Sequence, residues 1–123
     1  MKLLFTILFF LFIYSCNNNQ INILELREGT FETTLPKKNT KSIAVRTKTI
    51  QIETYNGKKD TFAIKWLNNF EYELLKIHPK SSLDSIPFMV KITKLSHNGY
   101  SFKAHYKGNK YIQKGKAIKL TIK

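Results

Sequence analysis

Cysteine is almost absent from this sequence. Cys16 is the single cysteine among 123 residues, so an internal disulfide is excluded. Long apolar runs are also missing. The longest, residues 3–14, has about 12 residues, whereas a helix needs ~20 to cross a bilayer. The chain therefore has neither a disulfide framework nor a segment long enough to span a membrane as a helix.

Acidic residues are scarce as well. The chain has 8 Asp and Glu residues against 21 Lys and Arg, a formal net charge of +13, and no acidic residue follows Asp84. A surface of this kind attracts the phosphates of lipids or nucleic acids. Arginine, which dedicated phosphate and base readers favour, occurs only at Arg27 and Arg46. Two interpretations stay open: compositional bias with a solvated lysine-rich face, or an anionic partner.

Catalytic and metal-binding patterns are missing too. His78, His97 and His105 lack the spacing of metal ligands, which must converge in threes or fours. No serine stands in the Gly-x-Ser-x-Gly setting of an esterase nucleophile. Asp60 and Asp84 have no sequence relation that would pair them. We therefore expect no enzymatic activity, no cofactor and no metal site, with an unrecognised enzyme as the remaining alternative.

The N-terminus carries the clearest signal that is present. Lys2 is followed by the apolar residues 3–14, then by the small Ser15, Cys16 and a polar run at residues 17–20. This order is typical of a secretory signal. Where the cut would fall, the sequence resembles a bacterial lipoprotein lipobox, which implies that the cysteine is lipidated and becomes the first mature residue. An ordinary signal peptide with a coincidental cysteine is the alternative.

The signal divides the chain into three parts. We expect a signal peptide at residues 1–15, a lipidated Cys16 opening a tether over residues 16–28, and one β domain over residues 29–123. Lipidation would make the protein exported and anchored to a bacterial membrane. Because residues 17–20 contain no acidic side chain, we expect the outer membrane, with the protein facing the periplasm.

The β domain is predicted from short apolar-alternating runs between turn signals. Asn56-Gly57 and Asn98-Gly99 suit type I′ hairpin turns, in which both central residues have positive φ. The predicted strands are residues 29–34, 42–48, 50–55, 61–67, 71–77, 88–95, 100–106 and 111–122. Eight sequential antiparallel strands favour an all-β fold, either a small lipocalin-like up-and-down barrel or a strongly curled sheet.

Side-chain alternation also predicts two strand registers. A three-residue turn at residues 68–70 sets Trp66 opposite Tyr72 and places opposite charges on the other face, so we prefer it to a two-residue turn. A two-residue turn at Asn98-Gly99 sets Leu95 opposite Phe102.

Two family resemblances support this interpretation. Gly29-Thr30-Phe31 resembles the Gly-x-Trp start of lipocalin-like barrels, with Phe31 in place of the tryptophan. A broader likeness rests on Gly29-Thr30-Phe31, Arg46, Gln51-Ile52-Glu53, Lys59-Asp60-Thr61-Phe62, Lys65-Trp66, Glu71-Tyr72-Glu73-Leu74, His105-Tyr106-Lys107-Gly108 and Gln113-Lys114-Gly115.

In these segments the chain resembles a family of small uncharacterised lipoproteins from flavobacteria and their relatives. Some members carry the label DNA topoisomerase IV. A type II topoisomerase needs an ATPase module and a strand-cleaving domain, which about 108 exported residues cannot hold. The resemblance implies an envelope lipoprotein and supplies no catalytic residues.

The remaining candidate residues are aromatic or basic. The aromatic ones either build the core or line a pocket at a barrel mouth: Phe62, Trp66, Tyr72, Phe102 and Tyr106. The basic ones would contact an anionic surface: Lys103, Lys107, Lys110, Lys114, Lys116 and Lys119.

We thus expect a non-enzymatic envelope lipoprotein that binds a small apolar or amphipathic ligand or an envelope protein. The alternative is an electrostatic adaptor that docks on anionic lipid or lipopolysaccharide through its lysine-rich C-terminal third. Export argues against nucleic acid as the partner.

Overall fold

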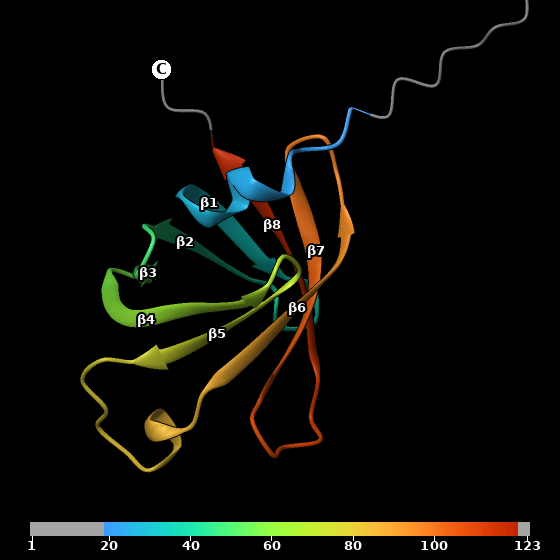
Figure 1. The fold of residues 1–123 in the computed structure, drawn as a ribbon. Coiled ribbons are helices and arrows are strands. Elements are labelled where there is room, and N and C mark those ends of the chain that lie inside the picture. The colour runs from blue at the N-terminus through green and yellow to red at the C-terminus, as the bar shows by residue number, and fades with distance from the viewer. Residues whose placement is uncertain (1–18, 121–123) are drawn as a thin grey trace, which may run out of the picture.

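The computed structural model describes residues 19–120, which form a closed barrel of eight antiparallel strands (Figure 1). Each strand pairs with the next along the chain, and the first also pairs with the last. The strands are β1 (Gly29–Leu35), β2 (Thr40–Arg46), β3 (Ile50–Tyr55), β4 (Lys58–Asn68), β5 (Glu71–Lys76), β6 (Phe88–Leu95), β7 (Gly99–Tyr106) and β8 (Gln113–Leu120). The all-β prediction is confirmed, and the barrel is the arrangement adopted. Cys16 and the predicted signal peptide over residues 1–15 lie outside the described residues.

Alternation of apolar side chains places one face of each strand inside the barrel. On β4 and β5, Ile64 and Leu74 are buried partners, while Lys65 and Glu73 pair on the outer surface. Trp66 stands opposite Tyr72, with ring centroids 4.7 Å apart, so the predicted pairing is confirmed. The predicted three-residue turn is wrong, because Asn68 pairs with Glu71 and an irregularity between Trp66 and Asn68 restores the register. The buried apolar residues are Ile21, Leu26, Phe31, Ala44, Ile64, Tyr72, Leu74, Val90, Ile92, Tyr100, Phe102, Ala104 and Ala117.

The two ends of the barrel differ. At one end the short 3-10 helix η1 (Ile23–Arg27) lies across the opening, and we call this the closed end (Figure 1). Asn22 caps η1 through its side chain, and Leu26 is fully buried. The opposite, open end carries the loops at residues 36–39, 56–57, 77–87 and 107–112, which include η2 (Pro36–Lys38) and η3 (Leu83–Ser85). Residues 21–27, which we assigned to the tether, therefore pack against the barrel.

One predicted hairpin is confirmed and the other is wrong. Asn56 and Gly57 have φ of 49° and 77°, as a type I′ turn requires. In the second hairpin Leu95 pairs with Tyr100 rather than Phe102, and β6 contains an irregularity between Ile92 and Lys94. Gly99 belongs to β7, where a Cβ would lie 1.9 Å from the carbonyl oxygen of Ala117. Close approach of β8, rather than backbone conformation, explains this glycine.

Several strand bounds also differ from the predicted ones, most of all in β4, which begins at Lys58 rather than at residue 61. β2 ends at Arg46 because Thr47 turns the chain, donating its backbone N–H to the Ile50 carbonyl and accepting the Ile50 N–H at its hydroxyl. β8 begins at Gln113 rather than at residue 111. No helix among residues 19–120 is long and apolar enough to cross a bilayer.

Candidate ligand-binding cavity

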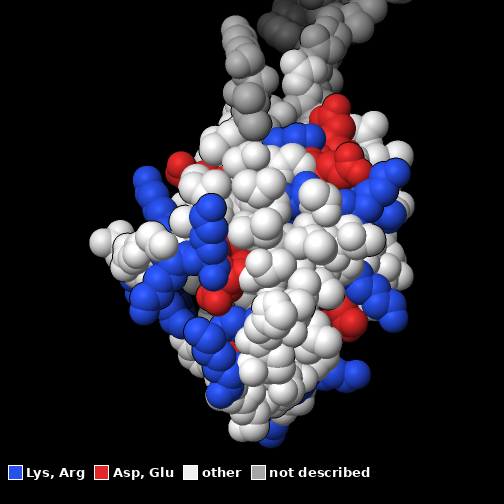
Figure 2. Space-filling view, turned by 90° about the vertical axis from the view of Figure 1, so that its left-hand side faces the viewer, with Lys and Arg blue, Asp and Glu red and all other residues white. Residues whose placement is uncertain are grey.

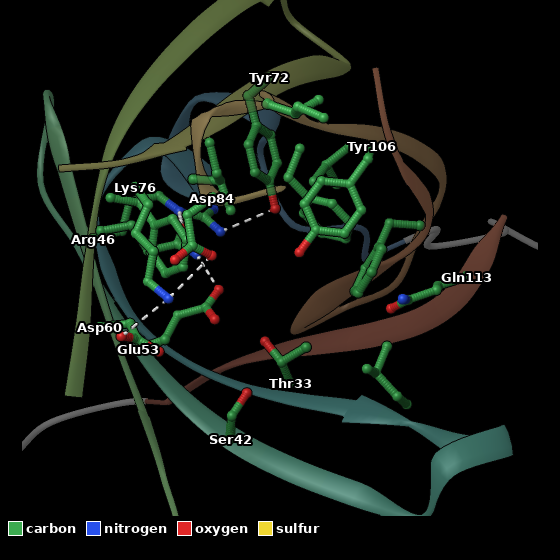
Figure 3. A pocket seen from close by; sticks show the side chains of 18 residues that line it. Thr33, Ser42, Arg46, Glu53, Asp60, Tyr72, Lys76, Asp84, Tyr106 and Gln113 are labelled. Atoms are coloured by element: carbon green, nitrogen blue, oxygen red, sulfur yellow. Dashed lines mark hydrogen bonds and ion pairs between the residues drawn. The ribbon is translucent and has the colours of Figure 1, made fainter. Parts of the chain in front are cut away.

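A cavity of about 290 Å³ occupies the open half of the barrel, close to the lower end of the range for ligand cavities. Figure 3 shows the hydroxyl groups of Thr33, Ser42 and Tyr106 directed into it. Most of the apolar wall comes from β4 to β7 and from the loop between β5 and β6. Of the nine polar lining residues other than tyrosine, five come from β1 to β3. The apolar wall consists of Leu35, Phe62, Leu74, Ile86, Phe88, Val90 and Phe102.

Arg46 forms the floor of the cavity. Its side chain is 3 % exposed and makes four hydrogen bonds inside the barrel. Nη1 donates to the carbonyl of Leu26 in η1, and Nη2 donates to the hydroxyls of Tyr72 and Tyr100 at 3.2 and 2.9 Å. Nε donates to Oε1 of Gln51 at 2.8 Å. Buried polar groups are tolerated when they are bonded in this way, so Arg46 fastens η1 to the barrel.

Aromatic rings surround the same guanidinium. Its central carbon lies 4.4 Å from the ring centroid of Phe31 and 4.8 Å from that of Tyr72, distances at which a cation is attracted to the ring face. The Tyr72 and Tyr100 hydroxyls are 2.8 Å apart. Burial raises the pKa of Tyr72 well above its usual value, so its hydroxyl keeps its proton. Side chains therefore fill the closed half.

Gln51 connects this floor to a carboxylate in the cavity wall. The Gln51 side chain accepts from Arg46 and donates from Nε2 to Oε1 of Glu53 at 2.8 Å. Among residues 19–120, no lysine or arginine nitrogen lies within 4.0 Å of the Glu53 carboxylate. Burial raises the pKa of Glu53, and the Gln51 hydrogen bond and the Arg46 charge oppose that rise. Glu53 is thus a carboxylate without a direct ion pair.

A second charged group stands at the rim. Nζ of Lys76 lies 3.5 Å from a carboxylate oxygen of Asp60 and 3.5 Å from one of Asp84 (Figure 3). Partial desolvation lowers the pKa of Lys76, but the two carboxylates outweigh it and raise the pKa overall. The backbone N–H of Lys80 donates to Asp84 and lowers the pKa of that carboxyl, as does Lys76. These contacts join the loop between β5 and β6 to the barrel.

The structure divides the five predicted pocket aromatics. Phe62, Tyr72, Phe102 and Tyr106 line the cavity. Trp66 lies toward the closed end instead, where its ring is 5.2 Å from the guanidinium carbon of Arg27. Its Nε1 is buried and has no hydrogen-bond partner among the described residues.

The six predicted surface lysines fall on separate parts of the barrel. Lys103 and Lys114 are cross-strand neighbours on the outer surface of β7 and β8, and Lys116 is exposed on β8. The loop between β7 and β8 supplies two more at the open end. Lys119 is at the closed end, where its Nζ donates to the carbonyl of Glu25 at 2.7 Å. They do not form one continuous surface.

Our sequence reasoning missed the polar part of the cavity. Arg46, Gln51 and Glu53 were quoted for the family resemblance and were given no role, although alternation puts 51 and 53 on one face of their strand. That shared face was the signal that could have found them. The pairing of Asp60 and Asp84 through Lys76 had no signal, because it depends on the fold of the loop over residues 77–87.

Within residues 19–120, no three His, Cys, Asp or Glu side chains are grouped as metal ligands. Comparisons with family models, with curated proteins and with solved structures found no match to this chain.

Proposed function

We propose that this protein is a non-enzymatic envelope lipoprotein whose barrel binds a small amphipathic ligand. The observation that carries the proposal is the cavity, which adjoins a floor built from an arginine that makes four hydrogen bonds. A packed barrel of this size has no structural need for such a space, since interiors are normally close-packed. The division of the wall into an apolar and a polar side favours a ligand with both kinds of surface.

The proposed anchor would hold the barrel by its closed end. The backbone N–H of Ile21 donates to the carbonyl of Ser96, in the turn between β6 and β7 at that end. Cys16 precedes Ile21 by five residues, a link of at most about 17 Å when extended. A lipid on Cys16 would therefore keep the closed end near the membrane and leave the cavity open toward the aqueous space.

Filling the cavity tests ligand binding. Ser42 and Lys41 are neighbours on β2, but the first side chain faces the cavity and the second is exposed. Ser42→Trp should abolish co-purification of a small molecule in native mass spectrometry, whereas Lys41→Trp should leave it unchanged. Equal retention by both variants, each with an unchanged circular dichroism spectrum, would contradict cavity binding.

Replacing the lipobox cysteine tests the anchor. Cys16→Ser should abolish metabolic palmitate labelling and release the protein from the membrane fraction. Continued labelling of this variant would refute the anchor and leave the cavity proposal untouched.

The electrostatic alternative has one specific observation in its favour. Lys91, Lys103 and Lys114 stand directly opposite one another across β6, β7 and β8. Like charges at such positions destabilise a sheet, and an anionic surface would relieve the repulsion. Binding to anionic vesicles should then fall in Lys103→Ser and disappear in about 0.5 M salt. Binding that ignores lipid charge would exclude this alternative.

A further inference from the structure

The cavity has the opposite charge balance from the rest of the chain. Only 8 of the 123 residues are acidic, yet three of them, Glu53, Asp60 and Asp84, line this one space. Two positive side chains, Arg46 and Lys76, also line it. The cavity wall thus carries one more negative than positive charge in a chain of formal charge +13. Figure 2 shows acidic side chains set among lysines on one face of the barrel.

Both positive side chains are already engaged by protein groups. Arg46 donates to Gln51, Leu26 and two tyrosine hydroxyls and is enclosed by aromatic rings. Lys76 lies between Asp60 and Asp84 at 3.5 Å from each. Four of the five Arg46 N–H donors are therefore used by protein groups, and Lys76 is already paired with two carboxylates, which leaves little capacity to bind an anionic ligand.

Of the five charged side chains that line the cavity, Glu53 is the one that forms no ion pair or charged contact closer than 4.0 Å with residues 19–120 and is not enclosed by aromatic rings. Gln51 bonds to Oε1, and this bond fixes the carboxylate while leaving Oε2 without a hydrogen bond from residues 19–120. The carboxylate projects into the same space as the Thr33, Ser42 and Tyr106 hydroxyls (Figure 3). A carboxylate oxygen and nearby hydroxyl oxygens are acceptors suited to an ammonium group, which has three donors and no acceptor.

We propose that the cavity selects an organic cation, a protonated primary amine with a small apolar body, whose ammonium group binds Glu53. This inference rests on the proposed cavity-binding function and names its ligand class. The apolar body packs against Phe62, Phe88 and Phe102, and the ammonium lies on the polar side of the wall. A bond between an ammonium and a carboxylate is charge-assisted and stronger than a neutral one.

Binding of an amine has a protonation signature. Burial raises the pKa of Glu53, and the nearby charge of Asp60 raises it further. The hydrogen bond from Gln51 and the charges of Arg46 and Lys76 lower it. An ammonium placed beside the carboxylate lowers that pKa again, because it stabilises the ionised form. Binding in mildly acidic solution therefore releases a proton from Glu53, and an uncharged ligand of the same shape would not cause this release.

Isothermal titration calorimetry on the full chain in zwitterionic lipid nanodiscs tests the inference, with empty nanodiscs as the blank. The probes share one aromatic body: 2-phenylethylamine, 2-phenylethanol and 3-phenylpropionate. We expect the amine to bind at least tenfold more tightly than the other two. Titrations at a series of pH values from 4.5 upward, each in two buffers of different ionisation enthalpy, should show proton release with the amine alone.

Glu53→Gln supplies the decisive variant, because it keeps the shape of the side chain and removes its charge. It should lower amine affinity by about 10- to 100-fold and abolish proton release, while affinity for the alcohol stays the same. Glu73→Gln, on the outer surface of β5 opposite Lys65, is the matched control and should change neither.

Each contrary result has a separate meaning. If the alcohol or the carboxylate binds as tightly as the amine, or Glu53→Gln binds the amine normally, the charge selection is wrong and cavity binding stands. If no probe gives a binding heat, or if Ser42→Trp leaves that heat unchanged, cavity binding itself is contradicted. The amine inference then fails with it.

Discussion

Around Arg46 the barrel is filled by side chains, whereas between Glu53 and Tyr106 it encloses about 290 Å³ of space. The closed half holds the two largest fully buried side chains, Phe31 and Leu26, and its buried cation bonds to four neighbouring residues. The open half has the partly buried aromatics Phe62 and Phe88 and a carboxylate, Glu53, that forms no direct ion pair with residues 19–120.

The difference indicates how stability and binding are distributed. Close packing and the hydrogen bonds of Arg46 hold the closed half in one arrangement. Polar groups that face a cavity contribute less to stability, and proteins keep such groups where a ligand is bound. Substitutions in the closed half should therefore destabilise the protein, whereas substitutions in the open half should affect mainly the ligand binding proposed above.

The largest expected effect compares one phenylalanine from each half. Phe31→Ala should lower the free energy of unfolding by about 3–5 kcal/mol, because the side chain is fully buried. Phe88→Ala, at a half-buried position on the cavity wall, should cost about 1–2 kcal/mol. Urea denaturation measures both. Equal losses of unfolding free energy would contradict the unequal contribution of the two halves to stability.

Two glycines give the next comparison. Gly99→Ala should cost about 3 kcal/mol, because the new Cβ would lie 1.9 Å from the Ala117 carbonyl oxygen and force β8 away. Gly57→Ala, in a turn at the open end with no atom within 4 Å of the new Cβ, should cost about 1 kcal/mol through its positive φ. Thermal melts of both variants would show whether this order holds.

Removing the charge of Arg46 or of Lys76 should destabilise the protein less than Phe31→Ala or Gly99→Ala does, and the two losses should be unequal. Arg46→Met leaves the Leu26 carbonyl and Gln51 without their donor and should cost about 2 kcal/mol. Lys76→Met should change the urea midpoint much less, because its ion pairs are partly exposed. If Lys76→Met is as unstable as Arg46→Met, the ion pairs at the rim contribute as much to stability as the buried arginine does.

The smallest expected effect is a pH dependence. The folded protein holds the Glu53 proton more tightly than the unfolded chain does, since the pKa is raised above 4.5. Stability linked to this group therefore falls as pH rises through the raised pKa. The unfolding free energies of the wild type and Glu53→Gln should be measured from pH 4 to 8. As pH rises, the free energy of the wild type should fall relative to that of the variant. A flat difference would show that Glu53 titrates normally.

Local patterns predicted much of the barrel. The pairing of Trp66 with Tyr72 could be predicted because it joins two aromatic rings on one face and Lys65 with Glu73 on the other. The irregularity between Trp66 and Asn68, which produces this pairing with a shorter turn, could not be predicted. Asn56-Gly57 followed from the backbone conformation that a type I′ turn needs.

The closed end could not be predicted in the same way. A buried arginine is rare, and its acceptability depends on partners 5 to 54 residues away in the sequence. Leu26 is buried because η1 covers one end of the barrel, and this contact depends on the complete fold. Gly99 looked like a turn residue because sequence alone does not reveal how close β8 comes.

The placement of η1 has a consequence for exchange kinetics. Because Leu26, Phe31 and Arg46 fill one end, a molecule in the cavity leaves through the opening by which it arrived. A competitor must wait for that departure, so the dissociation rate of a bound molecule should not depend on competitor concentration. The barrel would then act as a single-opening container whose residence time is set by the contacts at its rim.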